Sequence, residues 1–156
     1  MESWDRTAWV TRAEAVHQHA IGGAFTGWSI GLGSILSCCL YDKTKEIEVS
    51  KKYYLLDLWR EAGWDGERPI WRLEFQYRRE VLSQLQLQTL AEVMGNLNGL
   101  WSYATTEWLR LTLPSAEDKT RSRWPIHPLW GFALDPPAPE AKSGKTAKTT
   151  RARGAT

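Results

Sequence analysis

The stretch WRLEFQYRREVL, Trp71 to Leu82, alternates apolar and polar side chains, and LYDKTKEI, Leu40 to Ile47, begins with the same alternation. In a β-strand, alternate side chains point to the same face of the sheet. The pattern therefore predicts two strands, each with an apolar face and a face that carries polar side chains. If the two strands are neighbours, we expect Tyr41 to lie near Glu74.

A tyrosine beside a carboxylate suggests a specific chemistry. A phenolate can attack a phosphodiester and form a covalent intermediate, and a divalent cation held by a carboxylate can polarise the phosphoryl oxygen. Tyr41 and Glu74 therefore suggest DNA nicking by transesterification. The alternative is structural: Tyr41 is a rim residue of the core with a hydrogen-bonded hydroxyl, and Glu74 pairs with Arg72, Arg78 or Lys43.

The composition is that of one soluble domain, with 156 residues, of which 42% are hydrophobic and 24% charged. The ten tryptophans lie between Trp4 and Trp130, so we expect order over nearly the whole length and stability dominated by aromatic burial. The net charge of +2 excludes a global basic field, so any affinity for DNA must come from local patches.

The two vicinal cysteines, Cys38 and Cys39, have the spacing of neither a disulfide framework nor a metal site. This predicts a reduced, cytoplasmic setting. No apolar stretch approaches the roughly 20 residues that a spanning helix needs, and the polar start of the chain does not resemble a signal peptide. We therefore expect no membrane partner.

Turn signals and apolar spacing divide the first part of the chain into elements. A glycine pair ends residues 4–20, which predict either a strand leading into a short helix or one irregular helix. Residues 25–41 predict two paired strands joined at a glycine turn. Residues 50–62 predict a helix with Ser50 as its N-cap.

The second part of the chain changes from strand to helix. Residues 70–79 predict a strand, Thr89 is expected to cap a helix, and residues 98–111 predict a longer helix that Pro114 ends. Strands with one inserted helix, followed by helices, indicate an α+β domain. In such a domain, helices pack on one face of a small, mainly antiparallel sheet.

We expect the domain to span residues 1–134, because no aromatic or large aliphatic residue follows Leu134. Residues 135–156 cannot bury enough apolar surface to fold and predict a disordered basic tail. The tail is either a solubilising terminus or a tether that binds phosphates.

Five segments, in this order, resemble the replication initiation factor family: GWSIGLGS, LYDKTKEI, WRLEFQYRREVL, LWSYATTEWLRL and RSRWPIHPLW. This family comprises rolling-circle initiators and relaxases of plasmids, integrative elements and phages. The resemblance covers roughly residues 9–130 and corresponds to the C-terminal part of such proteins.

The resemblance implies site-specific, metal-dependent DNA nicking and joining through a tyrosine. The family's strand motif of Tyr, an acidic residue or Asn, and Lys is matched by Tyr41, Asp42 and Lys43. Its later Trp-Arg-x-Glu strand, which supplies an acidic residue to the metal site, is matched by Trp71, Arg72 and Glu74.

The cofactor implied is Mg²⁺ or Mn²⁺, held by Glu74 and Asp42, with Glu46 as a weaker candidate. The partner implied is origin DNA, single-stranded at the nick, with a homodimer as a further possibility. The expected contacts to DNA phosphates are Lys43, Arg72, Arg78 and Arg79.

The chain departs from the family in its length. Members have a longer N-terminal half with further strands and acidic residues, so about half of the catalytic domain is expected to be missing. The alternative function is therefore a truncated, catalytically silent relative that binds DNA or a protein partner.

Two other groups of residues have structural interpretations. His17-Gln18-His19 invites comparison with paired-histidine metal motifs, but the segment is interpreted as a helix, where side chains at i and i+2 do not face each other. Trp101 and Trp108 could stack on bases, although their helical spacing favours core packing.

Overall fold

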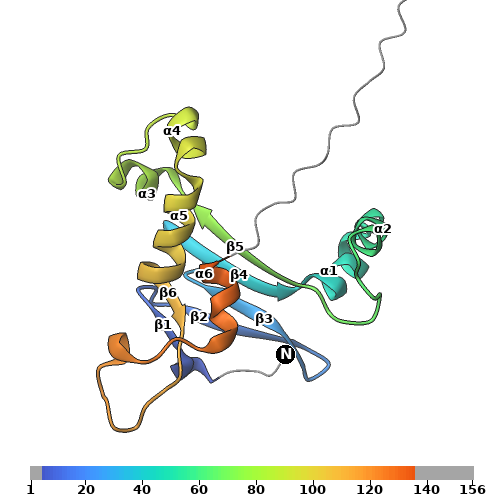
Figure 1. Cartoon of the computed structure of the whole chain (residues 1–156), viewed down its shortest axis with the longest axis horizontal. Helices are drawn as coiled ribbons and strands as arrows, with labels where there is room; N and C mark the ends of the chain where they lie inside the picture. The colour runs from blue at the N-terminus through green and yellow to red at the C-terminus, as the bar shows by residue number, and fades with distance from the viewer. Residues whose placement is uncertain (1–4, 136–156) are drawn as a thin grey trace, which may run out of the picture.

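The computed structural model describes residues 5–135 and contains two antiparallel sheets (Figure 1). The larger sheet has the order β2 (Val16–Ile21), β3 (Ala24–Ile30), β4 (Leu36–Asp42) and β5 (Trp71–Tyr77). The smaller sheet pairs β1 (Trp9–Thr11) with β6 (Leu109–Leu111). The predicted α+β class with a small, antiparallel sheet is confirmed.

The N-terminal segment differs from the prediction of a helix. A 3-10 turn, η1 (Arg6–Ala8), leads into β1, and His17, Gln18 and His19 lie within β2. The helical interpretation of these histidines is wrong, because β2 forms a hairpin with β3 across a glycine pair whose φ angles are 57° and 79°. Pairing between strands supplies the backbone hydrogen bonds that a helix would otherwise provide.

The predicted hairpin of residues 25–41 is confirmed as β3 and β4, and the predicted strand of residues 70–79 is confirmed as β5. The alternation that began at Leu40, however, does not continue. β4 ends at Asp42, and α1 (Lys43–Ser50) follows at once. The carboxylate of Asp42 accepts a hydrogen bond from the backbone N–H of Lys45 at 3.2 Å, which caps the helix.

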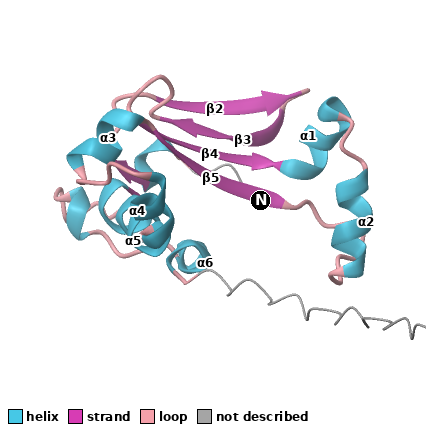
Figure 2. Ribbon diagram, turned by 90° about the horizontal axis from the view of Figure 1, so that it is seen from above, coloured by secondary structure: helices cyan, strands magenta, loops and turns pink. Residues whose placement is uncertain are grey.

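The predicted helix of residues 50–62 is present as α2 (Tyr54–Glu61). Ser50 is not its N-cap, because Ser50 is the last residue of α1, and Lys51 leaves that helix with a φ angle of 59°. Figure 2 shows α1 and α2 at one end of the four strands and α3, α4 and α5 at the other.

The C-terminal helices are shorter than the spacing predicted. They are α3 (Arg79–Gln84), α4 (Leu90–Gly95), α5 (Leu97–Ser102) and α6 (Gly131–Leu134), with 3-10 turns η3 (Arg121–Arg123) and η4 (Pro128–Trp130). The predicted cap of α4 is confirmed, since Thr89 forms a reciprocal capping box with Glu92.

The predicted helix of residues 98–111 ends early. A π-helical turn, η2 (Tyr103–Trp108), follows α5, and the next three residues form β6 instead of continuing to Pro114. Those residues pair with β1, a partner about 100 positions earlier that local spacing could not reveal.

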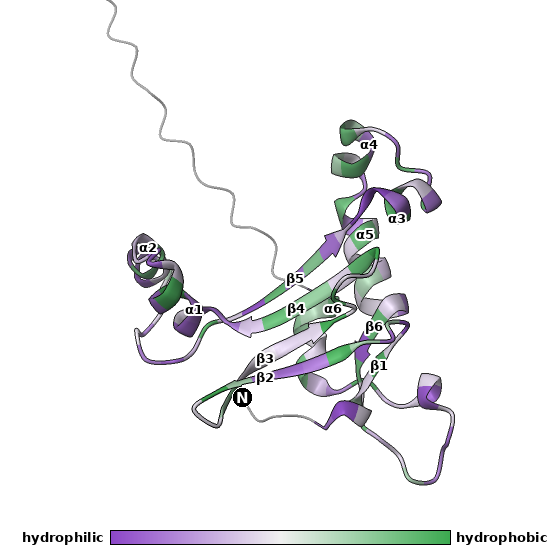
Figure 3. Cartoon of the chain, turned by 180° about the vertical axis from the view of Figure 1, so that it is seen from behind, coloured by the Kyte–Doolittle hydropathy of each residue, from purple (hydrophilic) through white to green (hydrophobic). Residues whose placement is uncertain are grey.

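The core lies between the apolar face of the larger sheet and the C-terminal elements. Phe75 of β5 packs edge-on against Trp101 at 5.4 Å and Trp108 at 6.3 Å between ring centroids. Trp9 packs in the same manner against Trp28 and Trp130. Figure 3 shows hydrophobic residues concentrated in β4. Core packing of Trp101 and Trp108, as expected from their spacing, is therefore confirmed.

The predicted basic tail falls outside the described part of the chain, apart from its first residue, Asp135. Within residues 5–135, no helix combines the length and the apolar character needed to cross a bilayer.

Candidate functional site

The larger sheet has a second face, here called the polar face, whose side chains alternate with those of the core. Its members form two rows across the strands. One row joins His17, Ser29, Cys39 and Glu74, and the next joins His19, Gly27, Tyr41 and Arg72. The sheet thus brings together side chains from positions 17 to 74.

Tyr41 and Glu74 are diagonal neighbours on the polar face, as the alternation predicted. Tyr41 pairs directly with Arg72, while Glu74 pairs with Cys39, two residues before Tyr41 in β4. On the other side Tyr41 pairs with Gly27, where an added Cβ would lie only 2.2 Å from the carbonyl oxygen of Leu40. The close approach of β3 to β4 beside Tyr41 therefore requires glycine.

The pKa of the Tyr41 hydroxyl is raised above its ordinary value. Burial is the main cause, and the negative charge of Glu74 acts in the same direction. The positive charges of Arg72 and Lys43 oppose the shift. Without a further positive charge, the phenol therefore stays protonated at neutral pH and needs a proton acceptor in order to attack.

Lys43 lies beneath Tyr41 and is almost wholly buried. Its side chain is 5% exposed, its ammonium nitrogen lies 5.7 Å from the centroid of the Tyr41 ring, and it forms an ion pair with Glu46. The Lys43 ammonium donates a hydrogen bond to the Glu46 carboxylate, which lowers the pKa of Glu46. Lys43 is placed to support the tyrosine ring, and its position does not offer a free cation to a phosphate at the surface.

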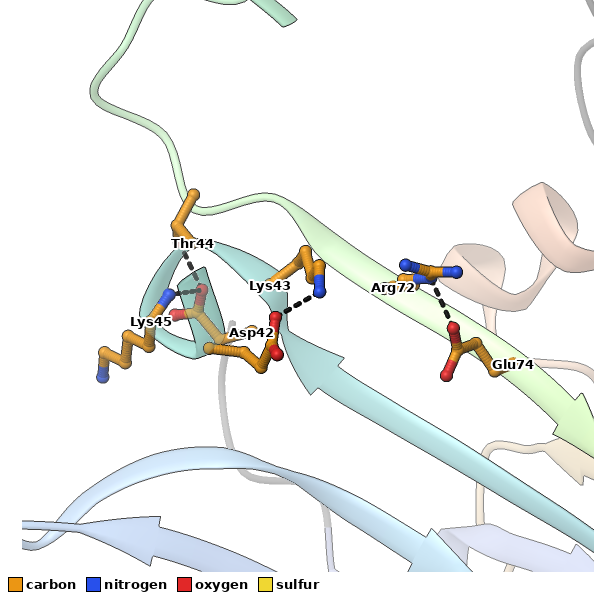
Figure 4. A network of polar contacts seen from close by, with 7 residues as sticks. Asp42, Lys43, Thr44, Lys45, Arg72 and Glu74 are labelled. Atoms are coloured by element: carbon orange, nitrogen blue, oxygen red, sulfur yellow. Dashed lines mark hydrogen bonds and ion pairs between the residues drawn. The ribbon is translucent and has the colours of Figure 1, made fainter. Parts of the chain in front are cut away.

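Asp42 and Glu74 do not lie together. Asp42 pairs with Trp71 on the core side of β4, is only 6% exposed, and accepts hydrogen bonds from the Thr44 hydroxyl and the backbone N–H of Lys45 (Figure 4). Glu74 points to the polar face. The two carboxylates predicted as joint metal ligands are thus on opposite faces of the sheet.

Glu74 forms an ion pair with Arg72, two residues earlier in β5 and on the same face (Figure 4). The guanidinium nitrogen lies 2.6 Å from the carboxylate oxygen, and both side chains are about half exposed, at 50% and 43%. Such a pair contributes little to stability, so both groups are accessible to a ligand that can compete for them.

Arg78 and Arg79 lie at the far end of β5, beside α3. Arg72 and Arg78 are six positions apart, which corresponds to about 20 Å of extended strand. The guanidinium of Arg79 donates to the backbone carbonyl oxygen of Gln88 at 2.7 Å. Of the four predicted DNA contacts, only Arg72 is an exposed cation next to Tyr41.

The histidines of β2 are the site residues that the sequence interpretation missed. The ring nitrogen Nε2 of His19 lies within hydrogen-bond distance, 2.8 Å, of the hydroxyl of Ser29, and His17 shares the same face. The signal was present in VHQHAI, whose alternation matches a strand as well as a helix. Among residues 5–135, however, no three His, Cys, Asp or Glu side chains lie close enough to hold a metal.

Comparison with known proteins gives one weak likeness. No family model and no curated protein matches the sequence. Among solved structures, the chain is similar to the rolling circle replication initiator protein from Geobacillus stearothermophilus, with 19% sequence identity and a TM-score of 0.42. The match covers 81% of this chain and 44% of the other, so the chain spans less than half of that protein.

Proposed function

We propose that the polar face nicks and rejoins DNA, with Tyr41 as the nucleophile, in the initiation of replication of a mobile element. The observation that carries the proposal is the placement of Tyr41 of β4 directly opposite Arg72 of β5 and diagonal to Glu74 of the same strand. The order of the five sequence segments that resemble replication initiators supports the same chemistry. That the substrate is DNA, and that it is cut at an origin of replication, are parts of the same proposal.

The proposed reaction uses three side chains. Arg72 binds the phosphate of the DNA strand through its guanidinium group, which suits two oxygens of one phosphate. As the Tyr41 oxygen forms a bond to phosphorus, the bond from phosphorus to the 3′ oxygen breaks. The phenol proton passes to Glu74 and then to the leaving 3′ oxygen. Attack by a 3′ hydroxyl on the phosphotyrosine reverses the steps and rejoins the strand.

Binding of the phosphate also releases Glu74. The carboxylate is held by Arg72 in the described structure, and a phosphate that engages the guanidinium competes for the same donors. Glu74 is then free to accept the proton of the neighbouring phenol. The ion pair therefore keeps the base occupied until a substrate arrives.

A divalent cation, Mg²⁺ or Mn²⁺, remains part of the proposal. Asp42 does not fit, because its carboxylate caps α1 on the other face. Of the two carboxylates expected to hold the cation, only Glu74 shares the face of Tyr41, so the ion would take its remaining ligands from water and the substrate phosphate. When bound, the ion would supply Lewis-acid polarisation of a phosphoryl oxygen. Mn²⁺ binding, measured by electron paramagnetic resonance, should weaken in Glu74→Gln and be unchanged in Asp42→Asn.

The test of the proposal is a covalent adduct. The protein is incubated with Mn²⁺ and single-stranded oligonucleotides that tile the DNA flanking its coding sequence, and then run on a denaturing gel. The proposal expects a shifted band that is absent for Tyr41→Phe. Binding of the oligonucleotides without an adduct from the wild type would sink the enzymatic proposal.

That negative outcome would favour the second function, a catalytically silent module that binds DNA or a protein. One observation supports it: Asp42 and Lys43, which match the family motif, are occupied by a helix cap and by an ion pair with Glu46. Only the nicking function predicts a covalent adduct, whereas both functions allow binding of DNA.

A further inference from the structure

β5 is an outer strand of the larger sheet in the described part of the chain. The amide of Lys43 donates to the carbonyl oxygen of Ile70, and the amide of Arg78 donates to that of Ile35. In an antiparallel pair, every second residue points its backbone N–H and C=O groups at the neighbouring strand, and these two hydrogen bonds fix which residues of β5 do so. Arg72, Glu74 and Gln76 therefore turn their backbone polar groups toward β4. Trp71, Leu73, Phe75 and Tyr77 turn theirs outward, to the open edge.

The surface beside this edge is apolar. A groove of about 450 Å³ runs along the core side of β5, lined by residues that include Leu73, Trp101, Leu129 and Phe132. A second hollow, of about 340 Å³, is lined by Phe75, Tyr77, Leu97 and Trp101, among others. The Phe132 side chain is 74% exposed and that of Leu97 49%. An open strand edge next to exposed apolar side chains is a site for pairing with another strand.

We propose that a second copy of this chain occupies the edge, with the two β5 strands antiparallel about a two-fold axis at Leu73. The proposal does not rest on the nicking reaction, although the interface engages Arg72 and Glu74, which that reaction also uses. In this register, Leu73 meets Leu73 of the second copy, and Trp71 meets Phe75 of the second copy. The exposed backbone groups of these residues face one another, so they can exchange hydrogen bonds.

Charge selects this register. With the axis at Leu73, Arg72 lies opposite Glu74 of the second copy, and the symmetry repeats the contact, which gives two pairs of opposite charge. With the axis at Glu74, two carboxylates would be opposed, and with the axis at Arg72, two guanidinium groups would be. Like charges directly opposite each other destabilise a strand pair. The sequence RLE about Leu73 is thus self-complementary.

The pairing would join the two sheets into one continuous sheet with both polar faces on the same side. Each Tyr41 would then lie one strand away from the interface. The apolar grooves of the two copies would meet on the opposite side and bury Phe132, Leu129 and Leu97.

Sedimentation velocity over a range of concentrations tests the pairing. The wild type should form a dimer. Arg72→Glu or Glu74→Arg alone should raise the dissociation constant at least about tenfold, because each puts two like-charge pairs into the interface. The double variant should restore the dimer. Lys119→Glu, an exposed position away from β5, makes the same charge change as Arg72→Glu and should leave association unchanged.

A cross-link tests the register without changing the charges. Leu73→Cys should form a disulfide-linked dimer under mild oxidation, because directly opposed residues of such a pair have Cα atoms about 5.5 Å apart, within disulfide range. Gln76→Cys should not form a linked dimer, because position 76 faces no cysteine in this register. The wild type is the control for linkage through Cys38 and Cys39. Circular dichroism checks that each variant is folded. A wild type that is monomeric at its highest soluble concentration would overturn the proposal. So would a dimer whose dissociation constant is the same in the charge variants and that Leu73→Cys does not cross-link.

Discussion

Tyr41 of β4 and Arg72 of β5 face each other as a cross-strand pair on the polar face of the larger sheet. Glu74 follows Arg72 on the same face and forms an ion pair with it. The tyrosine thus lies beside a positive and a negative charge, which act on its hydroxyl in opposite directions. The chemistry proposed for this face depends on that balance.

The first prediction concerns the pKa of Tyr41. A nearby negative charge disfavours the phenolate, so Glu74→Gln should lower the pKa of Tyr41. Arg72→Gln removes a positive charge and should raise it. The measurement is the ultraviolet absorbance of tyrosinate as a function of pH, with the matching Tyr41→Phe variant subtracted to remove the other four tyrosines. Shifts of the same sign in both variants would contradict the described arrangement.

The second prediction concerns the pH dependence of adduct formation. Because the pKa of Tyr41 is raised, the phenolate fraction at neutral pH is small and grows with pH. The initial rate of adduct formation should therefore rise from neutral to mildly alkaline pH. Glu74→Gln should reduce the rate at neutral pH, where the proton acceptor matters most, and reduce it less at alkaline pH. An equal loss at every pH would argue against Glu74 as the acceptor.

The third prediction separates the structural role of Asp42 from a catalytic one. Asp42→Ala removes the N-cap of α1 and should lower the free energy of unfolding by about 0.5–2 kcal/mol. Asp42→Asn retains a capping oxygen and should cost less. Urea denaturation measures both. Adduct formation should survive in Asp42→Asn, whereas its loss in a folded protein would return Asp42 to the reacting centre.

The fourth prediction tests the close approach of β3 to β4 beside Tyr41. At Gly27, φ is 154° and a Cβ would meet the carbonyl oxygen of Leu40, so Gly27→Ala should lower the free energy of unfolding by about 2–4 kcal/mol. Gly22→Ala is the matched control, because its φ is also positive, at 57°, but no atom lies within 4 Å. If both variants lower the free energy of unfolding equally, the close approach of β3 to β4 beside Tyr41 does not require glycine at position 27.

Local patterns predicted the elements whose signals are contained in one segment. The hairpin of β3 and β4, the strand β5 and the capping box at Thr89 were all found where glycines, alternation and capping residues indicated. Elements that depend on distant partners were not. β6 was expected to be the end of a helix, because its pairing with β1 is not a local property. β2 was expected to be helical although its partner β3 follows directly after the glycine pair, because its alternation was interpreted as part of a helix.

The candidate site shows the same division. Alternation within two segments sufficed to put Tyr41 and Glu74 on one face. The separation of Asp42 from Glu74 follows from the same alternation, since Asp42 comes directly after Tyr41 in β4 and points to the other face. The helix that begins at Lys43 turns the Asp42 carboxylate into a cap, and it also buries Lys43 under Tyr41. The histidines joined the polar face only because β2 is a strand.

The most direct test of the central claim is the identity of the residue that carries the DNA. The denatured adduct is digested with nuclease and trypsin, and the remaining nucleotide is located by mass spectrometry. Cleavage after Arg12 and Lys43 gives a peptide in which Tyr41 is the sole tyrosine, so the assignment is unambiguous. The account predicts a phosphonucleotide on Tyr41. A nucleotide on Tyr53, Tyr54, Tyr77 or Tyr103, with Tyr41 unmodified, would contradict it.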